Sequence, residues 1–229
     1  MQYLPVGRAY DQIRNSVCYP KLNVKICATH SGITVGEDGA THQMLEDISM
    51  MRTLPEMTVI SPSDEVQTKW AIKEISKINT PVYVRLARLN TNNIYEENQS
   101  FEIGKAVQIG EGVDGTVFAT GVTMQEAIKA KISLEEQGVN IRVVDIHTIK
   151  PIDKDMIIKC AKETKKLVSI EDHSIIGGLG SAISEVLTEE CPAKLVRLGI
   201  KDTFGKSGRA EELMEYYGIT AKEIVNQFS

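Results

Sequence analysis

Residues of types that commonly bind substrates or transfer protons are concentrated in one segment of the sequence, residues 29–43. It contains His30, Asp38 and His42 together with three glycines. A histidine can donate or accept a proton near neutral pH, a carboxylate accepts a hydrogen bond from a hydroxyl, and glycines let the backbone approach a ligand closely. From residue types alone, however, an ordinary surface loop with two solvent-facing histidines is the favoured interpretation.

The elements that must position this segment alternate between strand and helix. Apolar runs predict strands over 24–28, 58–60, 82–86, 116–119, 141–146, 167–170 and 195–198. Helical spacing predicts helices around 45–51, from an N-cap at Ser63 through 77, and over 124–136, 153–163, 180–190, 210–217 and 221–228. A strand, a helix and a second strand in succession require a crossover connection and favour a parallel sheet. The pattern therefore predicts an α/β fold whose parallel strands carry loops such as 29–43 at their carboxyl ends, where such folds bind ligands.

A polar stretch, residues 90–100, interrupts the alternation. It is rich in asparagine and has almost no apolar periodicity, so we interpret it as a linker. Two three-layer α/β units are then predicted, over residues 1–98 and 101–229. The first begins with a helical pattern and holds few strands, and we expect that it lacks its own N-terminal part and leaves a sheet edge unpaired.

Composition excludes several classes of protein. The 229 residues carry 26 basic and 31 acidic side chains, a formal charge of −5, which offers no general electrostatic attraction for nucleic acid. No apolar run is long enough to span a membrane. The four cysteines form no C-x-x-C pair, so we predict reduced thiols in a cytoplasmic protein and no metal site.

Several motifs together resemble the transketolase family, in the same order and at similar separations. They cover essentially the whole chain and comprise Gly36–Gln43 with its continuation to Arg52, Pro55–Asp64, Arg85–Arg88, Asp145–Asp153 and Glu171–Gly180. The chain is most similar to the C-terminal section of a split transketolase. The resemblance implies most of a pyrimidine-binding domain followed by a complete C-terminal domain, which in this family helps to form the dimer.

The resemblance also implies an activity and roles for four residues. The family transfers a two-carbon ketol unit between sugar phosphates, in the pentose phosphate pathway, with thiamine diphosphate and a divalent metal. His42 would be the catalytic residue, hydrogen-bonding oxygens of the donor sugar near the cofactor. Asp38 would accept from a hydroxyl of the acceptor sugar, and Arg88, with help from His30, would bind the sugar phosphate. An ordinary surface ion pair is the alternative for Arg88.

Part of the family's cofactor site has no match. No residue corresponds to the glutamate that contacts the aminopyrimidine ring, and Met1 and Leu4 stand where the family has aromatic rings, with Tyr3 shifted in register. We therefore expect the chain alone to be inactive. An N-terminal transketolase section would be its partner, sharing thiamine diphosphate and holding Mg²⁺ or Ca²⁺. The assembly would contain a homodimer of this chain formed through both domains.

Other interpretations remain open. The chain could be a subunit of another thiamine diphosphate enzyme, of the 1-deoxyxylulose-5-phosphate synthase or 2-oxo acid dehydrogenase beta type, or a non-catalytic assembly or regulatory module. The run Gly177–Gly180 before a helix could cradle a phosphate, but it lacks the lysine of a P-loop, so we favour a tight turn. A structural or interface role is expected for the neighbouring His173.

Overall fold

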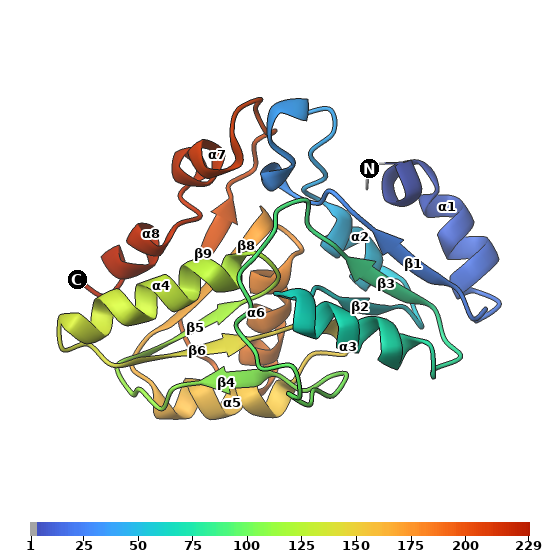
Figure 1. Cartoon of the computed structure of the whole chain (residues 1–229). Coiled ribbons are helices and arrows are strands. Elements are labelled where there is room, and N and C mark those ends of the chain that lie inside the picture. Colours follow the sequence, from blue (N-terminus) through green and yellow to red (C-terminus); the bar gives the residue numbers. More distant parts are fainter. Residues whose placement is uncertain (1–3) are drawn as a thin grey trace.

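The computed structural model describes residues 4–229, and the predictions for Met1 and Tyr3 lie outside that range. The described chain forms two sheets flanked by helices (Figure 1). The first sheet has the order β1-β3-β2-β7 and the second the order β4-β6-β5-β8-β9. Only β7 and β4 run antiparallel to their neighbours. The predicted α/β class with mostly parallel strands is confirmed.

The first sheet lies between two helical layers. Its strands are β1 (Lys25–Ala28), β2 (Thr58–Ile60), β3 (Val82–Arg85) and β7 (Thr148–Lys150). Side chains alternate across a strand, so Val82 and Val84 pack with α3 (Glu65–Ile75). Tyr83 packs on the opposite face with α2 (Asp47–Thr53). An N-terminal helical segment joins the α2 side, in three parts: η1 (Leu4–Arg8), α1 (Tyr10–Gln12) and η2 (Ile13–Cys18).

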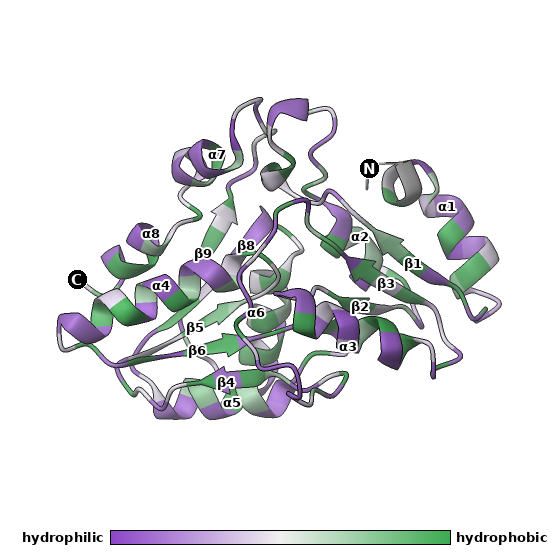
Figure 2. Cartoon of the chain, viewed as in Figure 1, coloured by the Kyte–Doolittle hydropathy of each residue, from purple (hydrophilic) through white to green (hydrophobic). Residues whose placement is uncertain are grey.

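The second sheet is layered in the same way. Its strands are β4 (Val107–Ile109), β5 (Gly115–Ala119), β6 (Ile141–Asp145), β8 (Leu167–Ser174) and β9 (Leu195–Ile200). One face packs against α4 (Thr123–Glu136), α7 (Ala210–Tyr217) and α8 (Ala221–Asn226). The other face packs against α5 (Lys154–Glu163) and α6 (Leu179–Glu190). The helices carry both hydrophilic and hydrophobic residues, and β6 is mainly hydrophobic, whereas the end of β8 is hydrophilic (Figure 2).

Three strands differ from the sequence prediction by more than two residues. β4 and β7 were not predicted, because each is only three residues long and is defined by its pairing with β6 or β2. β8 was predicted to end at Ile170 but continues to Ser174 through Glu171, Asp172 and His173. These polar side chains are buried and find partners inside the protein, so they do not end the strand as charged residues at a surface usually would.

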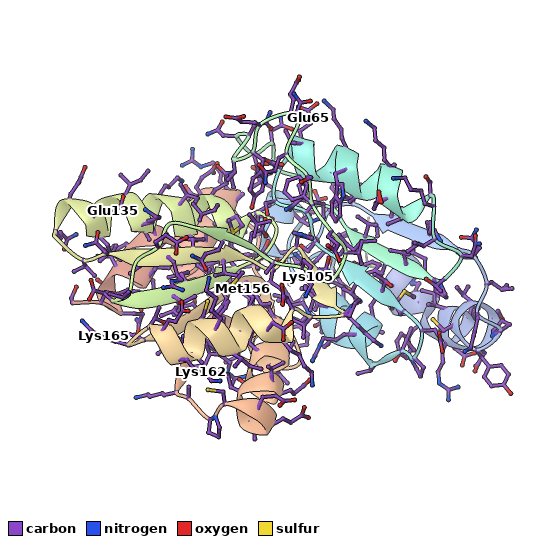
Figure 3. All side chains as sticks on the ribbon, turned by 90° about the horizontal axis from the view of Figure 1, so that it is seen from below. Glu65, Lys105, Glu135, Met156, Lys162 and Lys165 are labelled. Atoms are coloured by element: carbon purple, nitrogen blue, oxygen red, sulfur yellow. The ribbon has the colours of Figure 1, made fainter. Side chains whose placement is uncertain are left out.

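The polar stretch 90–100 carries no helix or strand, but it is held at several points. The Asp64 carboxylate accepts from the amides of Ile94 and Tyr95, at 2.8 and 3.1 Å. The Tyr95 hydroxyl donates to Asp145 over 2.7 Å. Beyond the stretch, the side chain of Lys105 lies beside the start of α5 (Figure 3) and pairs with Asp155 at 3.6 Å.

The N-cap of α3 is not the residue predicted from the sequence. Ser63 was expected to be the N-cap, but Asp64 holds that position and its carboxylate accepts from the Gln67 amide over 2.8 Å. The Ser63 hydroxyl donates instead to the buried Asp145 carboxylate, at 2.9 Å. Both residue types favour N-caps, and tertiary contacts decide between them.

Within the described part of the chain, no helix is long and apolar enough to cross a membrane.

Candidate functional site

The segment that follows β1 is a compact loop whose turns depend on glycine. Residues Ile33–Asp38 form the short helical element η3, which is kinked at Gly36. Gly32, Gly36 and Gly39 all have positive φ, at 73°, 85° and 76°, a conformation that side chains make costly. The loop follows a parallel strand at its carboxyl end, as predicted.

Arg88 and Asp38 lie together on this loop. The Arg88 guanidinium donates to the carbonyl oxygen of Val35 over 2.6 Å, and its Nη1 lies 3.7 Å from the Asp38 carboxylate. The second distance is too long for a hydrogen bond, and both side chains are about 40% exposed, at 42% and 37%. The pair is therefore weak. Several N–H donors of Arg88 and the carboxylate oxygens of Asp38 are therefore available to a ligand.

The two histidines have matching environments. Nδ1 of His30 lies 2.9 Å from the hydroxyl of Thr29, and Nδ1 of His42 lies 3.0 Å from that of Thr41. For Nε2 of either ring, the described residues supply no hydrogen bond. His30 also has a positive φ of 68°, an uncommon conformation outside glycine that recurs at functional sites. Each ring thus has one nitrogen fixed by its neighbour and the other open.

The four predicted site residues are only partly brought together. Asp38 and Arg88 meet directly, and His42 is tied to the same turn because its amide donates to the Gly39 carbonyl over 2.9 Å. His30 stands at the other end of the loop, and among residues 4–229 no hydrogen bond or ion pair links it to the other three. Its assistance to Arg88 stays a prediction.

A buried polar cluster lies between Asp47, which follows the loop in the sequence, and strand β3. The Asp47 carboxylate accepts from Arg85 Nε and from the Tyr83 hydroxyl, both at 2.8 Å. Burial raises the pKa of Asp47, but Arg85, with smaller contributions from His173 and the Tyr83 hydroxyl, leaves the pKa below its ordinary value. No role was predicted for Asp47 or Arg85 from the sequence. A signal for Arg85 was a charged residue at the end of an apolar run, Val82–Arg85, because a buried charge requires a partner.

His173 belongs to this cluster and corrects a prediction. The predicted strand ended at Ile170 and left His173 outside it, but His173 lies in β8 and is fully buried. Its Nδ1 donates to the carbonyl oxygen of Ser174 over 2.6 Å. Burial lowers the pKa of His173 to about 4, so the ring is neutral at physiological pH. The expected structural role stays a prediction that this burial favours.

Backbone amides of the run Gly177–Gly180 are hydrogen-bonded to a side chain of the protein itself. The amides of Gly180 and Leu179, at the start of α6, donate to the buried Glu171 carboxylate over 2.8 and 2.6 Å. A Cβ on Gly178 would lie 1.9 Å from a Glu171 oxygen. Burial raises the pKa of Glu171 to about 7, against the lowering effect of those amides. The run is a close-packed turn, since the amides that could hold a phosphate already hold this side chain.

A cavity of about 790 Å³ opens beside the loop, at the carboxyl ends of β1, β2 and β3. Thr29 and Ala87, the neighbours of His30 and Arg88, line it. Of the described residues, none with an aromatic ring lines the cavity. The Asp64 carboxylate at its wall is taken by the amides of α3 and of the segment 90–100. Glu65, the other carboxylate of the lining, pairs with Lys69 at 2.6 Å. The cavity thus lacks the ring surface and the unengaged carboxylate that an aminopyrimidine would need.

A metal centre is also missing from the part of the chain that the structure describes. No group of three or more histidine, cysteine, aspartate or glutamate side chains there could hold an ion. The residues present therefore do not fit thiamine diphosphate and its metal as a complete site.

Comparison with protein families matches nearly the whole chain. Residues 1–93 match the pyrimidine binding domain of transketolase, and residues 104–224 match the transketolase C-terminal domain. A protein of Methanocaldococcus jannaschii described as a transketolase C-terminal section is 51% identical over 224 residues, which are 96% of this chain and 70% of that protein. A 6-deoxy-6-sulfo-D-fructose transketolase subunit of a Clostridium species is 44% identical over 218 residues, 95% of this chain and 68% of the subunit.

A solved structure agrees with these matches. A split-gene transketolase, determined as an inactive beta4 tetramer, superimposes with a TM-score of 0.93 and 43% sequence identity. The match covers all of this chain and 73% of that one.

Proposed function

Because this chain belongs to the transketolase family, we propose that it is the C-terminal section of a split transketolase. Assembled with an N-terminal section, it would transfer a two-carbon ketol unit between sugar phosphates. The chain's own part in this activity is the loop 29–43 and Arg88, which together make a site for a polyhydroxylated substrate with an anionic end.

The observation that carries the proposal is the arrangement of Arg88. Its guanidinium is oriented by one hydrogen bond, to the Val35 carbonyl, and is only weakly engaged by Asp38. A planar guanidinium held in this way can give two parallel hydrogen bonds to phosphate oxygens. The phosphate of a sugar would bind there, with His30 as a second donor from the start of the loop.

Asp38 and His42 would act on the rest of the sugar. The half-exposed Asp38 carboxylate would accept from a sugar hydroxyl once Arg88 turns to the phosphate. His42, with Nδ1 held by Thr41, would present Nε2 to oxygens of the donor sugar. A site built to hydrogen-bond hydroxyls rejects analogues that lack them, so these two residues would select ketose and aldose sugars.

The cofactor would be bound mainly by the partner. Since the described residues do not form a complete site for thiamine diphosphate and its metal, the N-terminal section would supply the metal and most of the cofactor contacts. We further propose that this chain forms a homodimer, so that the assembly contains two copies of each section. The chain alone would be inactive.

The experiment that tests the proposal combines this chain with an N-terminal transketolase section from a matching split enzyme. We expect ketol transfer between sugar phosphates only in the mixture that also contains thiamine diphosphate and Mg²⁺. Size-exclusion chromatography confirms that the two sections associate. Association without transfer would instead favour a non-catalytic module, a reading that the incomplete cavity supports.

A panel of donors tests the substrate class. Fructose 6-phosphate is compared with 6-deoxy-6-sulfo-D-fructose, because a 44% identical relative is named for the sulfonated sugar. Preference for the phosphate supports the proposal. Transfer from the sulfonated sugar alone would retain the reaction type and refute the substrate class.

A further inference from the structure

The substrate loop is held by a residue from the other sheet. We propose that Asp172, near the end of β8, is a positioning residue that fixes this loop for substrate binding. The C-terminal half of the chain would then set the geometry in which Asp38 and His42 meet the sugar. The inference rests on the proposed function, because it concerns the same loop.

The contacts of the Asp172 carboxylate are all made to the loop. One oxygen accepts from the Ile33 amide over 2.9 Å. The other accepts from the Thr34 hydroxyl over 2.7 Å and lies 3.4 Å from the Thr34 amide. Asp172 is 2% exposed, and burial raises the pKa of its carboxyl, against the effect of Arg85 and of these donors. A buried carboxylate with three donors in one loop holds that loop in a single arrangement.

The loop is shaped to admit this carboxylate. A Cβ on Gly32 would lie 2.1 Å from an Asp172 oxygen, and the positive φ of Gly32 turns the next two amides toward it. Asp172 is itself fixed, because its carbonyl oxygen accepts from Arg85 Nη2 over 2.7 Å. Arg85 ends β3, three residues before Arg88. One rigid connection therefore joins the second sheet, the strand that leads to Arg88 and the first turn of the loop.

The far end of the loop is held by the same half of the chain. The amide of the buried Gln43 side chain donates to the Lys206 carbonyl over 2.8 Å, and the Ser207 hydroxyl donates to the Glu37 carbonyl over 2.6 Å. These contacts lie on either side of Asp38 and His42 in the sequence. Asp172 at one end and residues 206–207 at the other thus fix the loop as a closed unit, which is consistent with a role beyond assembly for the C-terminal half.

The test separates loop geometry from folding. Hydrogen exchange is measured on the full chain for Asp172→Asn and for Thr34→Val, which removes only the hydroxyl donor. We expect the amides of Ile33 and Thr34 to exchange about tenfold faster or more, because hydrogen bonds to a charged acceptor are lost. Thr34→Ser, which keeps the hydroxyl, should exchange like the wild type.

The kinetic part uses the complex with an N-terminal section. Misplacing a binding loop weakens substrate binding, so Asp172→Asn and Thr34→Val should raise KM for sugar phosphates about tenfold. Because His42 lies in the same loop, kcat should fall as well. A purely structural defect would lower the active fraction, and hence the apparent kcat, at unchanged KM. Asp145→Asn is the matched control: it alters a fully buried carboxyl in the second sheet whose partners are Ser63, Gln67 and Tyr95, outside the loop.

The outcomes are distinct. Faster exchange and a raised KM in the two loop variants, with neither change in Thr34→Ser or Asp145→Asn, support the inference. Wild-type exchange in Asp172→Asn, or a KM that stays constant while kcat falls, overturns it. If the wild-type complex shows no ketol transfer, the proposed function fails, while the exchange measurement still decides whether Asp172 fixes the loop.

Discussion

At the scale of single residues, Arg88 is the side chain whose surroundings say most about a ligand. With residues 4–229 it makes one hydrogen bond and one loose ion pair, although its guanidinium carries five N–H donors. A structural arginine at a surface would more commonly be engaged by a close carboxylate, as Arg52 is with Glu185 at 2.5 Å.

Replacing Arg88 by alanine tests its role. We expect KM for phosphorylated sugars to rise about tenfold to a hundredfold, since a charge-assisted bidentate contact is lost, with a smaller change in kcat. Steady-state kinetics of the assembled enzyme provide the measurement. Arg14→Ala, a change at an exposed arginine of the N-terminal helical segment, is the control, and an unchanged KM in Arg88→Ala would remove Arg88 from the site.

His42→Ala should act on turnover. Among the described residues only the Thr41 hydroxyl is hydrogen-bonded to its ring, and the bond from its backbone amide to Gly39 is kept in the variant. The melting temperature should therefore stay within a few degrees of that of the wild type. We expect kcat to fall about a hundredfold, the size typical for loss of one positioned polar group. Glu37→Gln, an exposed change in the same loop, should keep wild-type turnover. Full activity of His42→Ala would contradict the assignment.

The sequence pointed to the loop but not to what holds it. Asp38, His42 and Arg88 were predicted as site residues because they lie in motifs that resemble those of the family, and His30 because it lies in the same loop. The role of Asp172 was missed although Glu171–Gly180 was itself a motif, because its partners Ile33 and Thr34 are more than 130 positions away in the sequence. A contact of that kind depends on how two sheets pack, which periodicity does not encode.

At the scale of elements, the start of α3 illustrates how one side chain can serve two segments. One Asp64 oxygen caps the helix, and the other holds the segment 90–100 through two backbone amides. The helix and the connection between the sheets therefore depend on the same carboxylate.

Asp64→Ala should destabilise the chain by about 2–4 kcal/mol, the sum of a lost N-cap and of hydrogen bonds to a charged acceptor. Urea denaturation of the full chain measures the change. Asp64→Asn keeps an acceptor for the cap and should cost less. Asp155→Ala, at a carboxylate that is 90% exposed, should cost less than about 0.5 kcal/mol, and an equal cost at both positions would contradict the role of Asp64.

Most element positions could be predicted, and the exceptions have a common cause. Strand β2 and helix α7 match their predicted bounds, because apolar periodicity marks both. β4 and β7 are defined by a neighbouring strand more than by their own residues. β8 continues through charged residues that are satisfied internally. Pairing partners and buried polar networks are tertiary properties, and they account for what local patterns could not give.

At the scale of the whole molecule, Asp145 links the two sheets electrostatically. It ends β6, yet its carboxylate accepts from Ser63 and Gln67 at the first sheet and from Tyr95 in the connection. Burial raises the pKa of Asp145 from 3.8 to about 6, although these three donors lower it.

Stability should therefore depend on pH through Asp145. Between about pH 4 and pH 6 the folded chain keeps a proton on this carboxyl that the unfolded chain releases, so this residue's contribution to stability falls as pH rises. We expect the stability of the wild type relative to Asp145→Asn to decrease by about 3 kcal/mol across that window. His147 and His173, buried with pKa values of about 4, and Glu171 are present in both proteins. Their contributions to the pH dependence therefore cancel in the difference.

Chemical denaturation of both proteins at half-unit steps from pH 4 to pH 7.5 gives the difference. A difference independent of pH would mean that the Asp145 carboxyl has the same pKa in the folded and the unfolded chain, which would contradict a raised pKa.

Strand β7 joins the two halves of the chain by non-covalent contacts that do not depend on the connecting segment. It comes from the C-terminal half but completes the first sheet beside β2, and the amino group of Lys150 donates to the carbonyls of Arg52 and Leu54 at 3.0 and 2.6 Å. A protease that nicks the exposed residues 96–100 would cut the chain without separating its pieces. The two fragments would co-migrate under native conditions and separate only in denaturant, so their co-migration would report on the shared sheet and not on an intact backbone.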